Sequence, residues 1–254
     1  PQASFYAPST ASGKYEKDND PYSVSEFDNS PLKKVLRQGA VGTAWQPGTG
    51  KVQSVLQRVN IAGDEVRKFN SDASSSGFWA AGTLSVSEAV DEEGHTVVVF
   101  VDKMGNTVLK REWVDETIEG TYKDYKNTYY LYNQASLLVM MLPPKVVDRM
   151  MGASWALSSD DLNNNVYRYE YDNKGRQIGK KLPAMGWVYM VYDKLDRLCL
   201  MQTALHRTAN KWYFMKYDRL GRKVLEGILV DNTHTNRDLM QTYCDTYDYL
   251  NPAV

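Results

Sequence analysis

A six-residue phrase that recurs in the second half of the chain constrains its fold more than any other feature. The three copies occupy residues 171–176, 192–197 and 217–222 and share the pattern Tyr-Asp-x-x-Gly-Arg, with Asp196 in place of glycine in the second copy. Each copy follows an aromatic-rich run and precedes a run of mixed apolar and polar residues. A turn phrase repeated between extended runs is typical of stacked antiparallel β-hairpins. The phrase therefore predicts an all-β architecture.

Turn chemistry accounts for the aspartate and the glycine of the phrase. An aspartate that opens a type I turn accepts hydrogen bonds from nearby backbone amides. A glycine three residues later takes the left-handed conformation, which costs a residue with a Cβ about 1–2 kcal/mol, and the strand then restarts with a bulge. Asp196 is a tolerable replacement for that glycine. Ser136, in a related turn opened by Asn133, is a poorer one, so we expect a distorted hairpin there.

The residues of the phrase and of an earlier related turn are interpreted as structural, because the same types recur at the same positions. They are Asp102, Gly105, Asp172, Gly175, Arg176, Asp193, Arg197, Asp218, Gly221 and Arg222. We expect the arginines to pair with acidic neighbours, each exposed pair contributing about 0–1 kcal/mol. The alternative for the arginines is an anion-binding ladder.

Aromatic residues support the hairpin interpretation and also suggest a second function. The chain contains 18 Tyr and 6 Trp, and aromatic side chains favour strands. An isolated hairpin is marginal in water, so each unit needs its neighbour to bury the aromatic face. Exposed aromatic rings can instead stack on sugars. The candidate platform consists of Trp187, Tyr189, Trp212 and Tyr213, and the exposure of these rings separates the two interpretations.

The phrases and their flanking aromatic strands resemble the YD-repeat (Rhs-type) family over residues 22–230. Residues 26–32, 39–47, 102–111 and 128–144 are similar to the N-terminal module that precedes the repeats in large surface proteins of Gram-negative bacteria. The resemblance implies an elongated, curved sheet or partial β-shell with at most short helices. It also implies a secreted or surface-exposed protein whose shell encloses a C-terminal effector in many relatives. Asn133 and Ser136 depart from the repeat pattern, and no effector segment is present in this chain.

The chain is predicted to contain three regions. Residues 1–21 form a loosely ordered lead-in, residues 22–125 an N-terminal β-hairpin module, and residues 126–254 a YD-repeat strip continuous with that module. In the module, segments 52–61 and 65–69 are expected to pair, and the polar stretch 70–77 to act as a separator. A proline pair at 143–144 ends a strand, and a short helix is expected over residues 145–151. Residues 158–165 are interpreted as a polar insertion.

Charge and spacing point away from several classes of function. The net charge is −1, from 30 basic and 31 acidic residues, and gives no reason to expect nucleic acid or a membrane surface as partner. No apolar run of 18 residues is present, so no membrane span is expected. The histidines, including His95 in a turn where it is expected to be solvated, lack metal-binding spacing. Cys199 and Cys244 leave a single disulfide possible but untested.

The predicted function is a non-enzymatic structural segment of a secreted or cell-surface YD-repeat protein. No catalytic constellation, metal site or cofactor site is recognisable, and an enzymatic interpretation rests only on the polar insertion and on the basic and acidic residues of the turns. The expected partners are further repeats and an effector of the same polypeptide, on the surface or outside of a Gram-negative bacterium. A leader is not visible at Pro1, which suggests a trimmed segment. The alternative is a carbohydrate-binding or adhesion module that recognises glycans through exposed Tyr and Trp. The sequence identifies no ligand, cargo or oligomeric state.

Overall fold

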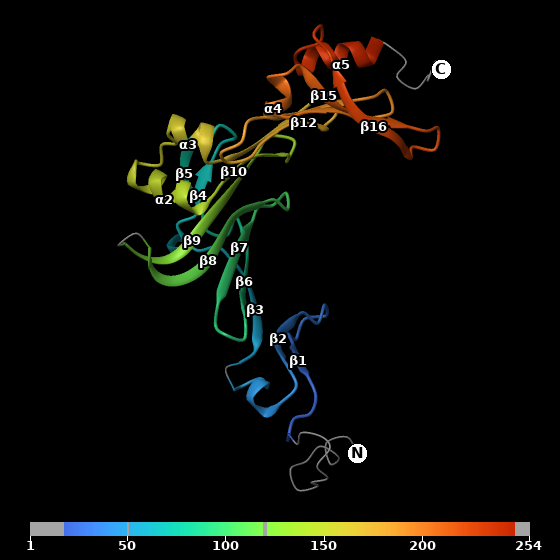
Figure 1. Ribbon diagram of the computed structural model, residues 1–254. Helices are drawn as coiled ribbons and strands as arrows, with labels where there is room; N and C mark the ends of the chain where they lie inside the picture. The colour runs from blue at the N-terminus through green and yellow to red at the C-terminus, as the bar shows by residue number, and fades with distance from the viewer. Residues whose placement is uncertain (1–17, 50, 119–120, 247–254) are drawn as a thin grey trace. The chain divides into compact units, whose positions relative to one another are not determined.

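The computed structural model describes residues 18–49, 51–118 and 121–246. Over these residues the chain is built mainly of antiparallel strands with a few short helices, which confirms the predicted all-β class (Figure 1). Fourteen strands follow one another in the order β1-β2-β3-β6-β7-β8-β9-β10-β11-β12-β13-β14-β15-β16, and β4 pairs separately with β5. The order follows the sequence except at the β4–β5 excursion, as expected for consecutive hairpins.

The chain divides into two compact units, one of residues 1–69 with 75–130 and one of residues 70–74 with 131–254. The division between Tyr130 and Leu131 lies within strand β9, as does the boundary that we predict at residue 126. Of the predicted lead-in, residues 1–17 lie outside the described residues. The carboxylate of Asp18 accepts hydrogen bonds from the backbone N–H and the hydroxyl of Thr43, at 2.8 and 2.6 Å.

The first unit is a series of hairpins with two short 3₁₀ turns. Its elements are β1 (Val24–Phe27), β2 (Val35–Gly39), η1 (Thr43–Trp45), β3 (Gln53–Val59), η2 (Ala62–Asp64), β4 (Arg67–Phe69), β5 (Ser75–Phe78), β6 (Ser85–Val90), β7 (Thr96–Val101), β8 (Thr107–Ile118) and β9 (Thr121–Tyr132). A row of buried residues in register crosses β6 to β9, namely Val86, Phe100, Leu109 and Tyr129. This row is the centre of the core of the first unit.

The β4–β5 hairpin covers one end of that row. Phe69 contacts Tyr129 edge to face with ring centroids 5.0 Å apart, and the backbone N–H of Arg67 donates to the Tyr129 hydroxyl at 3.1 Å. The predicted pairing of segments 52–61 and 65–69 is therefore wrong, because β3 pairs with β2 and β6 while β4 pairs with β5. The stretch predicted as a separator contains strand β5. A turn with left-handed Ala73 (φ 67°) folds it back onto β4.

In its described residues, the second unit joins hairpins through the three copies of the phrase and adds four helices. Its elements are β10 (Leu138–Leu142), α2 (Pro144–Gly152), α3 (Ser159–Asn164), β11 (Tyr167–Tyr171), β12 (Gln177–Lys181), β13 (Val188–Tyr192), β14 (Leu198–Gln202), α4 (Ala204–Arg207), β15 (Lys211–Tyr217), β16 (Lys223–Val230) and α5 (Arg237–Thr246). The predicted helix after the proline pair is α2, with Pro144 at its start. The polar insertion forms α3, whose Ser158 hydroxyl caps the helix by accepting from the N–H of Asp161.

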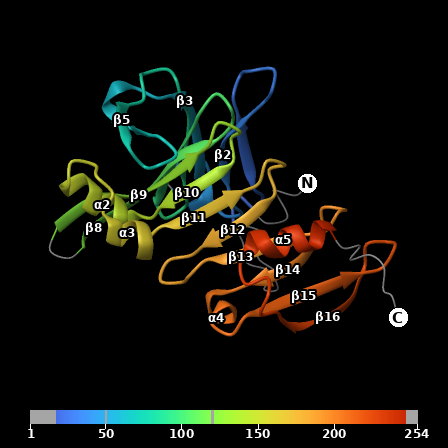
Figure 2. The same cartoon turned by 90° about the horizontal axis from the view of Figure 1, so that it is seen from above.

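Helix α5, which the sequence pattern did not predict, completes the core of the second unit. Its Met240 and Cys244 lie four residues apart on one helical face and pack with Val191 and Trp212. Figure 2 shows this helix lying along the strands that it covers, and β13 is among its contacts. Cys199 and Cys244 are free thiols in this cluster. The neighbouring Cys244 and burial together raise the pKa of the Cys199 thiol far above its usual value.

Replacement of Trp212 tests this core. Because its side chain is fully buried, Trp212→Ala should lower the free energy of unfolding by about 3–5 kcal/mol through lost contacts and the cavity left behind. Urea unfolding followed by far-UV circular dichroism measures the change. Trp187→Ala, in a partly exposed position of the same unit, is the matched control and should cost about 1 kcal/mol. Equal losses for the two variants would contradict the assignment of Trp212 to the core.

Candidate functional site

Each copy of the phrase folds into the same hydrogen-bonded turn. In the first copy, the N–H of Asp172 donates to the carbonyl of Arg176 and the N–H of Gly175 donates to the carbonyl of Asp172, both at 3.0 Å. The Asp172 carboxylate oxygen Oδ1 accepts from the backbone N–H groups of Lys174 and Arg176, at 3.0 and 2.9 Å. The second and third copies repeat all four bonds at 2.9–3.0 Å. The aspartate side chain thus holds the bend in every copy.

The residue at the glycine position is left-handed in every one of these turns. Gly105, Gly175 and Gly221 have φ of 86°, 78° and 78°, and Asp196 has φ of 60°. In each of the three hairpins formed by the phrase the strand register shifts beside the tyrosine, as expected of a bulge.

The turn opened by Asn133 is not distorted, so that expectation is wrong. Ser136 adopts φ of 56°, and its N–H donates to the Asn133 carbonyl at 3.0 Å. The Asn133 side-chain oxygen accepts from the N–H groups of Ala135 and Leu137, both at 3.0 Å. An amide oxygen therefore serves the backbone as well as a carboxylate does, and the strain at serine is tolerated.

A further copy of the turn, opened by Asp91, was missed as a member of the series. The Asp91 carboxylate accepts from the N–H groups of Glu93 and His95, at 2.9 and 2.8 Å, and Gly94 is left-handed. His95 occupies the position of the arginine, with its ring Nδ1 3.0 Å from Asp91 Oδ2. His95 is exposed, as expected, but it also contacts the carboxylate. The Asp-x-x-Gly spacing was the available signal, without the flanking Tyr and Arg.

The arginine of each phrase closes onto the second carboxylate oxygen. Arg176 Nε donates to Asp172 Oδ2 at 2.7 Å, and the second and third copies make the same bond at 2.7 and 2.6 Å. Burial alone would raise the pKa of Asp172. The backbone and side-chain hydrogen bonds from Arg176 outweigh burial and hold that pKa below its usual value. Both carboxylate oxygens are thereby occupied within the turn.

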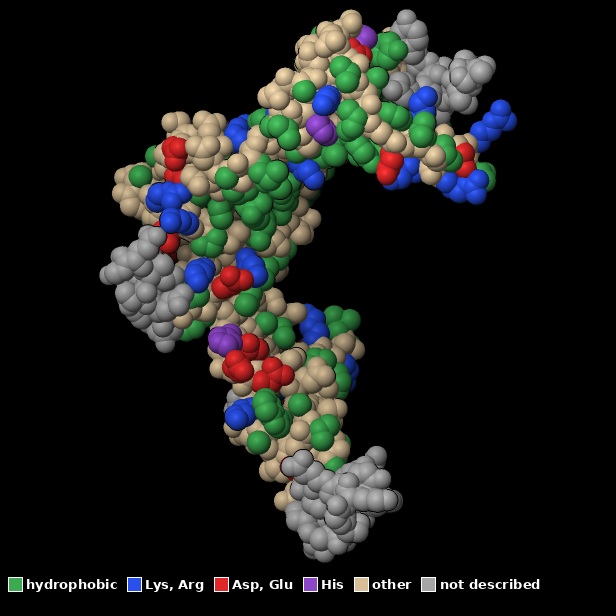
Figure 3. All heavy atoms as spheres, viewed as in Figure 1, with side chains coloured by type: hydrophobic (Ala, Val, Ile, Leu, Met, Phe, Trp, Pro, Cys, Tyr) green, Lys and Arg blue, Asp and Glu red, His purple; other side chains and the backbone are tan. Residues whose placement is uncertain are grey.

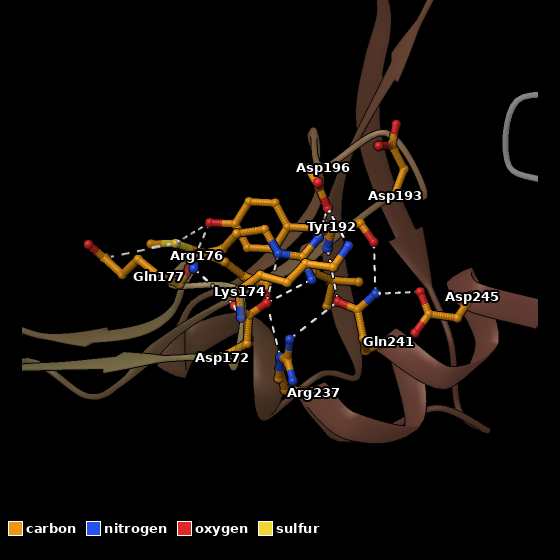
Figure 4. Close-up of polar contacts among 12 residues, drawn as sticks. Asp172, Lys174, Arg176, Gln177, Tyr192, Asp193, Asp196, Arg237, Gln241 and Asp245 are labelled. Carbon is orange, nitrogen blue, oxygen red and sulfur yellow. Dashed lines mark hydrogen bonds and ion pairs between the residues drawn. The ribbon is translucent and has the colours of Figure 1, made fainter. Parts of the chain in front are cut away.

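The same arginines connect one phrase to the next. The guanidinium of Arg176 lies over the ring of Tyr192 with 4.7 Å to the centroid, and Arg197 lies over Tyr217 at 4.8 Å. Arg176 also pairs with Asp196 of the following turn at 2.5 Å. Figure 4 shows Arg176 among Asp172, Asp196 and Tyr192. We call this contact between the arginine of one phrase and the tyrosine of the next a rung.

The tyrosine hydroxyl adds a second connection at each rung. Tyr192 donates to the carbonyl of Gln177 at 2.7 Å, and Tyr217 donates to that of Leu198 at 2.8 Å. The accepting residue lies five positions after the aspartate that opens the preceding turn. Tyr171 follows the same rule with the Asn133 turn, donating to Leu138 at 2.9 Å. This regularity explains why tyrosine rather than phenylalanine precedes the aspartate.

No further phrase follows Arg222 in the described part of the chain, and no tyrosine there makes a rung with this arginine. The Arg222 side chain is 74% exposed, against 20% for Arg176 and 17% for Arg197. Strand β16 is also the last strand in the order of the sheet. The burial of these arginines therefore comes from the next hairpin and not from the turn itself.

Helix α5 contacts the second phrase, at Tyr192. The side-chain amide of Gln241 accepts from the N–H of Tyr192 at 3.0 Å and donates to its carbonyl at 2.8 Å, the two bonds that a neighbouring strand would make. Arg237 Nε donates to the carbonyl of Met190 at 3.2 Å. Figure 4 places Arg237 and Gln241 beside Tyr192. Tyr192 is thus held by its backbone, its ring and its hydroxyl.

The aromatic residues proposed for sugar stacking do not form one exposed row. Trp212 is fully buried, so its ring cannot meet a ligand, and it is removed from the candidate platform. Trp187 and Tyr189 stack on each other with ring planes 4° apart, and Arg168 and Arg207 lie over these rings at 5.1 and 4.7 Å. Tyr213 is partly exposed, and the neighbouring Glu226 carboxylate raises its pKa. These rings mainly serve packing between strands.

Metal-binding and membrane-spanning features were also sought in the described residues. No group of three or more His, Cys, Asp or Glu side chains is arranged there to hold a metal ion. None of the helices in the described ranges is both long and apolar enough to cross a membrane. Basic and acidic side chains are interspersed on the face that Figure 3 shows, consistent with the near-zero net charge.

Comparison with known proteins relates this fold to a toxin complex. A family described as a domain of unknown function, DUF6443, matches residues 1–57. No curated protein matches the chain. A chain of the Photorhabdus luminescens Tc holotoxin pore with the mutation TccC3-D651A is similar over 88% of this chain at 11% identity, with a TM-score of 0.51. The crystal structure of TcdB2-TccC3 matches over 83% at 14% identity, with a TM-score of 0.46.

These matches concern the fold and only part of much longer chains. This chain spans about a tenth of their length, 10% for the holotoxin pore chain and 11% for TcdB2-TccC3. The fold of this chain is therefore similar to that of a segment of the holotoxin pore chain.

The substitution Asp172→Asn separates the effect of the aspartate charge on stability from the role of the side chain in the bend. Because Asn133 opens a turn of the same geometry, Asp172→Asn should fold normally but lose the ion pair with Arg176. The folded-state pKa of Asp172 is lowered, so the pair contributes fully above the unfolded pKa of ~3.9 and is lost as pH falls through the folded value. The variant should be less stable by about 1 kcal/mol at pH 7.

Urea midpoints at pH 7, 5 and 3 measure this difference, which should shrink towards pH 3 for Asp172→Asn. Asp218→Asn is the control, because its partner Arg222 is largely exposed, and it should show a smaller difference at every pH. A difference that stays constant with pH would show that charge is not involved.

A double-mutant cycle tests the rung between Arg176 and Tyr192. Arg176→Ala with Tyr192→Leu should give a coupling free energy of about 0.5–2 kcal/mol, because the guanidinium loses its ring. Tyr192→Phe keeps the ring, so its cycle with Arg176→Ala should give little coupling. Arg222→Ala with Tyr192→Leu is the matched control and should be additive in urea unfolding. Additivity of all three pairs would contradict the rung.

Proposed function

We propose that this chain is a non-enzymatic structural segment of a YD-repeat (Rhs-type) protein, in which its hairpins form part of a β-sheet wall. The observation that carries the proposal is the use of the motif side chains. The carboxylate of each aspartate accepts hydrogen bonds from its own turn, and the hydroxyl of each tyrosine donates to the preceding hairpin. Because the aspartate and tyrosine side chains make these hydrogen bonds, they hold the hairpins together and are not free to react. This is the chemistry of a scaffold.

The wall is proposed to enclose or display a C-terminal effector of the same polypeptide. The fold similarity to a segment of the Tc holotoxin pore chain supports a place within a larger protein. The resemblance of the phrases to YD repeats supports further repeats as the immediate partner, in a protein located outside or on the surface of a Gram-negative bacterium. Exposed Arg222 at the last strand offers the start of another rung to such a repeat.

The full-length protein that contains this sequence tests the proposal. We expect electron microscopy to show these hairpins as part of a continuous wall, and proteinase K to leave the region that the wall surrounds intact. Arg176→Ala with Arg197→Ala removes two rungs and should speed cleavage of that region several-fold. Lys194→Ala, at an exposed position within the second turn, is the matched control and should leave the cleavage rate unchanged.

Two results would overturn the wall. One is a density map in which these hairpins end as an isolated domain with no continuing sheet. The other is a cleavage rate that is the same in the wild type, the double arginine variant and the lysine control.

A further inference from the structure

A hollow of about 320 Å³ lies on one face of the sheet in the first unit. It is lined by residues of β3, η2, β6, β7, β8 and β9, among them Arg58, Asp64, Glu88, Arg111, Trp113 and Tyr125. Its volume falls at the lower end of the range of ~300–1,000 Å³ that is common for small-molecule sites. None of these side chains belongs to the repeated phrase, so the scaffold role does not account for them.

Strand register explains why these residues meet. Glu88 pairs with Val98, which pairs with Arg111, and Trp113 pairs with Tyr125. Residues two apart on a strand share a face, so Arg111 and Trp113 point to the same side. The neighbouring row of Phe100 and Leu109 on that face is buried, while Trp113 is 38% exposed. The hollow thus lies where the covered part of the sheet gives way to an open part.

The aromatic part of the hollow is a fixed pair with one open ring. Trp113 and Tyr125 pack edge to face, with centroids 5.0 Å apart and planes at 85°. The Arg111 guanidinium lies over the rings of Phe100 and Tyr125, at 5.3 and 5.6 Å, and its Nε donates to Asn127 at 3.0 Å. An aromatic surface is therefore held beside a positioned hydrogen-bond donor, with little freedom to be lost on binding.

The polar part of the hollow is balanced in charge. Arg58 binds Asp64 through two hydrogen bonds of 2.7 and 2.8 Å, which occupies both groups and, despite burial, lowers the pKa of Asp64. The Glu88 side chain is half-buried and attracts the Arg58 guanidinium electrostatically, but it makes no hydrogen bond to the described residues, so its carboxylate can still accept one. Two cations and two anions sum to zero, which favours a neutral ligand over an ion.

We propose that this hollow binds a neutral sugar, one pyranose residue of a carbohydrate. An aromatic face beside a carboxylate and a guanidinium matches a pyranose, which offers C–H groups on one face and hydroxyls at its edge. Trp113 would meet the apolar face, Glu88 would accept from hydroxyls, and Arg111 would donate to them. The inference concerns the first unit and is independent of the proposed wall.

Methyl glycosides of glucose, galactose and mannose are the probes, titrated to about 50 mM against the whole chain and followed by saturation-transfer NMR. A single small site of this kind should bind at least one of them with a dissociation constant of ~1–10 mM. Trp113→Ala and Glu88→Gln should each weaken binding about tenfold, with unchanged circular dichroism. Trp45→Ala is the matched control, because Trp45 lies in the same unit and is 37% exposed.

The outcomes separate the neutral-sugar site from other possibilities. Absence of binding for all three glycosides overturns the proposal, as does binding that survives both Trp113→Ala and Glu88→Gln. Glucuronate and glucosamine are tested alongside, and tighter binding of either charged sugar than of the neutral ones would overturn the choice of a neutral ligand. Glu88→Gln leaves the side-chain volume almost unchanged, so this variant still tests the proposal if Trp113→Ala does not fold.

Discussion

The architecture of the second unit depends on the aspartate carboxylate of each phrase, whose two oxygens accept hydrogen bonds from different groups. In each phrase Oδ1 accepts two turn amides and so fixes the bend, while Oδ2 accepts from the arginine four residues later. An unpaired arginine side chain samples many rotamers, and fixing it in one of them costs about 2 kcal/mol of conformational free energy. Because the carboxylate holds the guanidinium, that side chain is presented to the tyrosine of the next phrase. A local turn interaction thus sets the spacing of neighbouring hairpins.

The natural variants of the turn show that the bend and the rung are separate devices. Asn133 with Ser136 gives the bend without a charge, and Asp91 with His95 gives it with a different partner for the carboxylate. In the first unit, the β4–β5 hairpin instead covers the Tyr129 end of the buried row across the sheet. The tyrosine–arginine rung is therefore additional to the hydrogen-bonded bend, which also forms without it.

Sequence reasoning succeeded where the determining interactions are local. The turns, the strands beside them and helix α2 follow from residues within a few positions of one another. It failed where distant segments decide the outcome. Trp187 and Trp212 lie at the beginning of similar aromatic-rich segments, yet only Trp212 is fully buried, because α5 brings Met240 and Cys244 onto it from far along the chain. The hollow depends likewise on the register of β6, β7, β8 and β9, which no single segment encodes.

The repeated turns and the hollow differ in how many of their polar side chains already have hydrogen-bond partners in the protein. Asp172 and Arg176 each bind at least two groups of the protein, so a ligand could reach them only by breaking existing contacts. The Glu88 side chain is half-buried in the hollow that Trp113 and Tyr125 help to line, and it makes no hydrogen bond to the described residues. Its carboxylate can therefore accept a hydrogen bond from a bound hydroxyl without first breaking one. The repeated turns are therefore expected not to bind a ligand, whereas the hollow offers a hydrogen-bond acceptor to one.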